Sequence, residues 1–71
     1  MVIINGYEIK PGADLSGIDL TGANLSGLNL SNINFSGAIL ARANLSNTYL
    51  VGSDLTGVDF SDTDQLFAIQ N

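Results

Sequence analysis

The chain has 71 residues, which is room for one domain, and a formal net charge of −5 from seven acidic and two basic residues. So few Lys and Arg residues argue against direct nucleic-acid binding and against a patch for anionic lipids, since both need clustered basic side chains. Cys and His are absent, which excludes disulfides, thiolate or imidazole metal ligands and His-based acid–base chemistry. No apolar run approaches the roughly 18 residues of a membrane span.

Residues 1–12 are predicted to form a hairpin-like cap and a lead-in. Asn5-Gly6 is the strongest two-residue hairpin signal, and it separates two short segments, residues 2–4 and 7–9. Two such strands are not stable alone, so we expect them to lie over the part of the chain that follows. The side chains expected to close that end are Ile3, Tyr7 or Ile9. The start of the chain has no basic flank, so we expect no signal peptide and a cytoplasmic location.

Residues 13–62 consist of ten consecutive five-residue units. Each unit has Leu or Phe at its centre. The residue before it is Asp or Asn in eight units, the exceptions being Ile39 and Tyr49. Gly or Asn stands two residues after it in eight units, the exceptions being Arg42 and Asp62. The central residues, which we expect to form the structural core, are Leu15, Leu20, Leu25, Leu30, Phe35, Leu40, Leu45, Leu50, Leu55 and Phe60.

A period of five fits neither a regular helix nor a straight strand. On a helix the Leu would rotate by about 140° per unit, and on a strand alternate Leu would face opposite sides. All the Leu face inward only if the chain bends the same way in every unit. Gly or Asn after each Leu supplies the positive φ of a type II turn at each bend. The repeat therefore predicts an all-β fold, a β-solenoid.

The residue two positions before each Leu also points inward, and the size of its side chain indicates how many units make one turn. Close packing places large side chains against small ones in neighbouring turns. With four units per turn, Ile33 lies between Ala13 and Ser53, and Ala38 lies between Ile18 and Val58. Three or five units per turn would stack large on large or small on small. We therefore expect residues 20 apart to lie above one another.

The units Ala13-Asp14-Leu15-Ser16-Gly17, Ala23-Asn24-Leu25-Ser26-Gly27 and Ala43-Asn44-Leu45-Ser46-Asn47 resemble the A-(D/N)-L-x-x motif of the pentapeptide-repeat family. The resemblance covers residues 13–62 and implies a right-handed quadrilateral β-helix. At 20 residues per turn this gives about two and a half coils, roughly 12 Å tall. Three residues depart from the small side chain usual at the inward position, and they are Ile18, Leu28 and Ile33.

The repeat fails after Asp62, since position 65 is Gln65 where an apolar residue is due. Asp62 or Thr63 can cap a short helix, so we expect residues 63–71 to form a helical C-terminal cap. Its apolar contacts would be Leu66, Phe67 and Ile69. These residues either cover the last coil of the same chain or form a homodimer interface. The resemblance to the family implies the second alternative as well, because the dimer interface of such proteins is often built near the C-terminus.

The outward acidic residues are expected on two adjacent faces, with Asp14 and Asp54 on one and Asp19 and Asp59 on the next. One reading is a solvated surface. The other is mimicry of DNA, because some proteins that the chain resembles present a negative rod to topoisomerases and protect them from quinolones. A 12 Å body spans only about four base-pair steps, which argues against the second reading. Arg42 is expected to form an exposed salt bridge with Asp62 or Asp59.

Three outward positions are apolar, namely Ile39, Tyr49 and Val51. Single exposed apolar side chains are ordinary in soluble proteins. Tyr49 and Val51 are expected to share a face, however, and an aromatic ring beside an aliphatic side chain suits a partner contact.

No nucleophile–base pair is present, and a solenoid filled with Leu leaves no internal pocket. The sequence therefore predicts no catalytic residue, no cofactor and no metal. We expect a non-enzymatic protein-interaction or structural module that binds another protein or a second copy of itself. The alternative is an acidic inhibitor or protector of a DNA gyrase-type topoisomerase. The family resembled is bacterial and especially abundant in cyanobacteria, where most of its proteins have no assigned activity.

Overall fold

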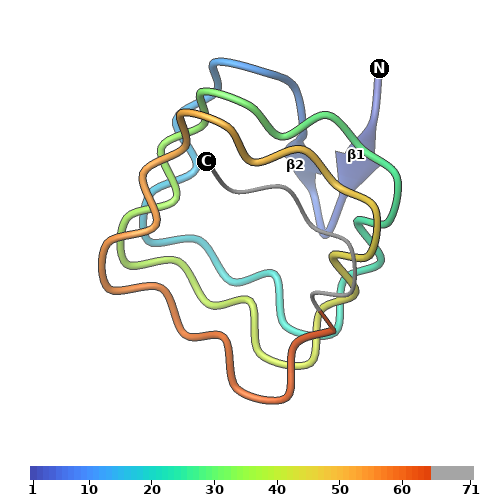
Figure 1. The fold of residues 1–71 in the computed structure, drawn as a ribbon, viewed down its shortest axis with the longest axis vertical. Helices are drawn as coiled ribbons and strands as arrows, with labels where there is room; N and C mark the ends of the chain where they lie inside the picture. Colours follow the sequence, from blue (N-terminus) through green and yellow to red (C-terminus); the bar gives the residue numbers. More distant parts are fainter. Residues whose placement is uncertain (65–71) are drawn as a thin grey trace.

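The computed structural model describes residues 1–64, which begin with a two-stranded hairpin (Figure 1). Strand β1 (Ile3–Ile4) pairs antiparallel with β2 (Tyr7–Glu8). The two residues between them, Asn5 and Gly6, have φ of 52° and 84°. Positive φ at both central residues is the signature of a type I′ turn, so the Asn-Gly signal forms the hairpin that the sequence predicts.

The hairpin packs one side against the rest of the chain. Ile9 is buried, and Ile4 and Tyr7 pack against the core. Ile3 points away, with 54% of its surface exposed. Of the three side chains expected to close this end, Ile9 and Tyr7 do so and Ile3 does not.

Residues 13–64 wind into a coil that bends once every five residues (Figure 1). Parallel bridges join positions 20 apart: Asp14 with Asn34, Asp19 with Ile39, Asn24 with Asn44, Asn29 with Tyr49, Asn34 with Asp54, Ile39 with Asp59 and Asn44 with Asp64. Four units therefore make one turn of the coil. Ile33 lies between Ala13 and Ser53, as the packing argument predicts. The Asn34 N–H, next to Ile33, donates to Ala13 O, and the Asp54 N–H, next to Ser53, donates to Ile33 O.

Each side ends in a turn that the sequence predicts. The central Leu accepts a hydrogen bond from the N–H three residues on, as between Ala23 and Leu20 (3.0 Å). The second central residue has positive φ, 71° at Gly22, as a type II turn requires. Arg42 and Asp62 adopt the same left-handed conformation, with φ of 58° and 54°, although they are neither Gly nor Asn.

One turn is closed in a different way. At Leu30–Ile33 the Ile33 N–H donates to Ser53 Oγ (3.0 Å), and the Ser53 hydroxyl donates to Leu30 O (2.5 Å). A side chain of the next coil thus bridges the two backbone groups that bond directly in the other turns. The Thr63 hydroxyl also donates to the coil below, to Leu40 O at 2.6 Å, but the turn at Leu40 still closes directly, since the Ala43 N–H bonds to Leu40 O at 3.0 Å.

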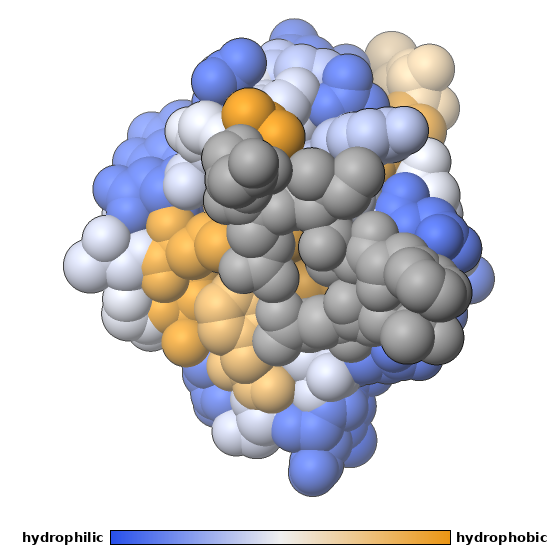
Figure 2. Space-filling view, in the orientation of Figure 1, coloured by the Kyte–Doolittle hydropathy of each residue, from blue (hydrophilic) through white to orange (hydrophobic). Residues whose placement is uncertain are grey.

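The interior is filled by the central Leu and Phe residues together with the small inward residues. Eight central residues, from Leu15 to Leu50, are buried. Leu55 and Phe60 in the last coil are only partly buried, as is Val58 between them. Figure 2 views the molecule from this end and shows apolar surface there.

Residues 63 and 64, the last two that the structure describes, also belong to the coil. Asp64 bridges Asn44, its N–H donating to Ala43 O (3.0 Å), and Thr63 occupies the inward position above Ala43. Residues 63 and 64 thus share the geometry of the ten units, and the boundary at residue 62 stays a prediction. The helical cap expected from Leu66, Phe67 and Ile69 lies outside the described residues. A search of residues 1–64 for an apolar helix of membrane-spanning length finds none.

Candidate functional site

The outward surface of the coil is organised by its corners. In eight units the side chain of the Asp or Asn before the central residue accepts a hydrogen bond from the N–H two positions further on. In the unit of Asp19, the Thr21 N–H donates to Asp19 Oδ1 at 2.9 Å, and the Thr21 hydroxyl donates to the same oxygen at 2.6 Å. This Asx turn satisfies an N–H that the coil itself leaves without a partner. We call these units the Asx corners, and their acceptors are Asp14, Asp19, Asn24, Asn29, Asn34, Asn44, Asp54 and Asp59.

The sequence contains a signal for these corners in the residue that follows each central Leu or Phe. Every unit with Asp or Asn before its central residue has Ser or Thr directly after it. The two units without Asp or Asn have Ala41 and Val51 there instead. The acceptor and the hydroxyl are therefore present or absent together in the sequence, and in five of the eight corners the hydroxyl also donates a hydrogen bond to the acceptor.

The corner bonds also act on the acidity of the exposed carboxylates. The Thr21 hydroxyl, and after it the Thr21 N–H, lower the pKa of Asp19 below its ordinary value of 3.8. Ser61 lowers the pKa of Asp59 in the same way. Ser16 and Thr56 do so for the pKa of Asp14 and of Asp54. A hydrogen bond to the charged form favours that form, which is the physical cause of all four shifts.

The units of Ile39 and Tyr49 lack this acceptor, and we call them the open corners. Their turns still form, since the Ser53 N–H bonds to Leu50 O at 3.1 Å. The N–H groups of Ala41 and Val51, however, have no hydrogen-bond partner in the described part of the chain. At each open corner a backbone donor is available to an external acceptor.

A shallow depression of about 430 Å³ lies at the open corner of Tyr49. Tyr49 and Val51 are 52% and 43% exposed. Gly52 leaves room for the neighbouring Asn32 side chain, because a Cβ at Gly52 would collide with the Asn32 amide oxygen. The lining residues are Asn29, Ser31, Asn32, Tyr49 and Val51.

The three apolar candidates do not form one surface. Tyr49 and Val51 line the same depression, whereas Ile39 lies on another side of the coil, bridged to Asp19 and Asp59. Sequence reasoning missed Asn29, Ser31 and Asn32 as parts of the site. The signal for them is the 20-residue offset, since Asn29 bridges Tyr49 one coil later.

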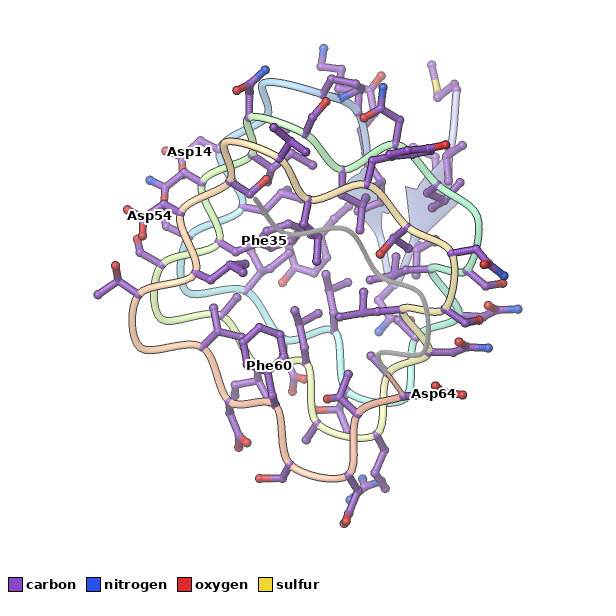
Figure 3. The ribbon with its side chains drawn as sticks, in the orientation of Figure 1. Asp14, Phe35, Asp54, Phe60 and Asp64 are labelled. Carbon is purple, nitrogen blue, oxygen red and sulfur yellow. The ribbon has the colours of Figure 1, made fainter. Side chains whose placement is uncertain are left out.

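The acidic side chains of the two predicted faces alternate with neutral residues. Asn34 separates Asp14 from Asp54, and these two carboxylates project on the same side of the molecule in Figure 3. Ile39 separates Asp19 from Asp59 in the same way.

The prediction of a salt bridge at Arg42 is wrong. Within residues 1–64, the ion pair closer than 4.0 Å joins Lys10 Nζ and Glu8 Oε1 at 3.9 Å. The Arg42 guanidinium is held by neither Asp62 nor Asp59, because an exposed pair gains too little to order a long side chain. In this described range no three potential ligands gather into a metal site.

Comparison with known proteins agrees with this geometry. The sequence model for pentapeptide repeats matches the chain with eight copies, over residues 11–37 and 29–64. A search of curated proteins finds no match to the chain. The matched residues are those that form the coil, its buried Leu column and its Asx corners. The chain therefore belongs to the pentapeptide-repeat family.

Proposed function

We propose that this protein is a non-enzymatic, cytoplasmic protein-interaction or structural module. The observation that carries the proposal is the depression at Tyr49, where an exposed ring and Val51 lie beside a backbone N–H that has no partner among residues 1–64. Exposed aromatic side chains with neighbouring aliphatic ones are the usual centre of protein contacts. Proteins of this family are generally structural or interaction modules, which supports the same conclusion.

The lining of the depression also argues against catalysis. Its five side chains are amides, a hydroxyl, a phenol and an aliphatic group. None of these is a carboxylate or a cationic group that could act as a general base or fix a charged substrate. The site offers contact area and hydrogen bonds, which suit binding.

The proposed architecture is a right-handed quadrilateral β-helix of about two and a half coils with a helical C-terminal cap. In this proposal Leu66, Phe67 and Ile69 cover the last coil or join two copies into a homodimer. Light scattering on the wild type and on Phe67→Asp separates these alternatives. A wild-type dimer that dissociates on substitution supports the homodimer, and a monomer in both cases removes it.

The second candidate, an acidic mimic of DNA, is favoured by the four exposed carboxylates on two neighbouring faces. Their spacing argues against it. Asp14 and Asp54 lie two coils apart, which is roughly 9.6 Å at about 4.8 Å per strand spacing. Phosphates follow every 3.4 Å along one strand of DNA, about three times more densely. A gyrase supercoiling assay tests this candidate, and no inhibition at high protein concentration removes it.

The proposed interaction is tested by photo-crosslinking in the source organism. A photoreactive phenylalanine analogue replaces Tyr49 in one variant and Ile39 in the matched control, because both side chains are exposed at open corners. We expect a discrete crosslinked protein from position 49 that is lost when untagged wild-type protein competes. Equal and uncompeted labelling from both positions would show that the Tyr49 side is no specific contact surface.

A further inference from the structure

We infer that the depression at Tyr49 binds an asparagine side chain of a partner protein. The amide oxygen of that asparagine accepts a hydrogen bond from the Val51 N–H. The inference rests on the proposed interaction function and names the chemistry that the partner presents. Its starting point is a comparison of corners within the same coil. Eight corners carry their own oxygen acceptor, and the corner of Tyr49 carries none.

The position of the missing acceptor is defined by the Asx corners. In the corner beside it in the same coil, Asn44 Oδ1 receives the Ser46 N–H at 2.9 Å and the Ser46 hydroxyl at 2.7 Å. The turn at Tyr49 has the same backbone form, with φ of 78° at Gly52. The Val51 N–H is therefore directed to the side of residue 49, where the other corners place their oxygen.

A free N–H alone does not make a site, and the second open corner shows the difference. Ala41 also has an N–H without a partner in the described residues. Its neighbour Ile39 lies between Asp19 and Asp59, and neither Ala41 nor Ile39 lines the depression. At Tyr49, by contrast, the free donor coincides with a hollow and with an exposed aromatic ring.

The lining selects a neutral amide rather than a carboxylate. It contains no cationic side chain, and the whole protein carries a net charge of −5, so an incoming anion is repelled. The Asn32 amide and the Tyr49 hydroxyl make no hydrogen bond in the described residues, so both can pair with the amide group of the ligand. The depression, of about 430 Å³, is shallow and is lined by these same side chains, so a single amide side chain of a partner can enter it.

The experiment is an ¹⁵N-edited NMR titration of the full chain with three capped tripeptides. Acetyl-Gly-Asn-Gly-amide is the probe, acetyl-Gly-Asp-Gly-amide tests charge, and acetyl-Gly-Leu-Gly-amide lacks the side-chain acceptor. With the Asn peptide we expect a downfield shift of the Val51 amide proton that saturates. The Ala41 amide proton serves as an internal control and is expected to drift linearly. A Val51 response equal to that of Ala41 for all three peptides would overturn the inference, as would a response to the Leu peptide equal to that to the Asn peptide.

Two double variants complete the test. Tyr49→Asn with Val51→Ser installs the missing acceptor and its hydroxyl, so we expect the saturable shift to be lost. Ile39→Asn with Ala41→Ser makes the same change at the other open corner and is expected to leave the shift intact. Retention of the shift in the Tyr49 variant contradicts the inference. If crosslinking at position 49 succeeds while the Asn peptide leaves Val51 unchanged, the interaction function stands and the amide chemistry falls.

Discussion

Phe35 and Phe60 are the two phenylalanines at central positions of the repeat, and both side chains lie inside the coil (Figure 3). Phe35 is fully buried, with 0% of its surface exposed, whereas Phe60 is only partly buried. The local sequences around them, Asn34-Phe35-Ser36 and Asp59-Phe60-Ser61, are nearly the same. Their difference comes from the place of each unit in the stack of coils.

The middle of the coil is therefore the well-packed region, and the last coil is the weak one. A unit in the middle has neighbours 20 residues before it and 20 residues after it, as Asn34 has in Asp14 and Asp54. Solenoid stability is a sum of such nearest-neighbour contacts, so units at an end have fewer of them. This explains why an end of the coil needs covering, as the hairpin residue Ile9 covers the first one.

The largest expected effect comes from truncating the two phenylalanines. Phe35→Ala should lower the free energy of unfolding by about 3–5 kcal/mol, because it leaves a buried cavity. Phe60→Ala should cost about 1–2 kcal/mol, since part of its surface is already exposed. Urea denaturation followed by circular dichroism measures both. Phe35→Leu, which restores the residue usual at this position, keeps the comparison measurable if Phe35→Ala does not fold. Equal losses at the two sites would refute the contrast between middle and end.

The next largest effect concerns the link between the two regions, the hydroxyl bridge from Ser53 to the turn at Leu30–Ile33. Ser53→Ala removes both hydrogen bonds and should destabilise the protein by about 1–2 kcal/mol. Ser16→Ala is the matched control, because Ser16 is exposed and lies outward. Thermal melting of the two variants tests the bridge. No difference between them would mean that the turn at Ile33 closes directly, as the other turns do.

A smaller and opposite effect is expected at Arg42, which belongs to the middle coil and has a left-handed backbone with φ of 58°. Arg42→Gly should stabilise the protein by up to about 1 kcal/mol, because glycine adopts this conformation without steric cost. Arg42→Ala keeps the strain and serves as the control. A gain in melting temperature with alanine equal to that with glycine would assign the effect to the side chain instead of the backbone.

The smallest effect is the pH dependence from Asp14, Asp19, Asp54 and Asp59, which are fully exposed. Their pKa values are lowered in the folded chain, mainly by the side-chain hydroxyl two residues on. Their contribution to stability is present above the ordinary value of 3.8 and is lost as the pH falls through the lowered values. Replacing all four by Asn, the residue of the other Asx corners, should flatten the fall of melting temperature below about pH 4. An unaltered slope in the fourfold variant would count against the corner bonds.

Much of the fold could be predicted from the sequence because its repeat is short and regular. The Leu spacing and the Gly or Asn two residues later predict the bends, and positive φ is found even at Arg42, where the residue type does not favour it. The size argument at Ile33 predicts the 20-residue offset. The shared face of Tyr49 and Val51 could be predicted from the same offset, which also places Ile39 on another side, between Asp19 and Asp59. The amide and hydroxyl side chains that complete the depression were not predicted.

What the sequence determined by itself is what a single unit can encode: an inward column of Leu, a bend with positive φ, and an outward acceptor paired with a hydroxyl. These features depend on residues within five positions of one another, so local sterics and local hydrogen bonds suffice. What only the tertiary structure decided is what neighbouring coils do to each other. The Ser53 bridge, the close approach of the Asn32 side chain to Gly52, and the different burial of Phe35 and Phe60 each depend on residues 20 or more positions apart. These features follow from packing between coils, and the sequence of a single unit carries no information about that packing.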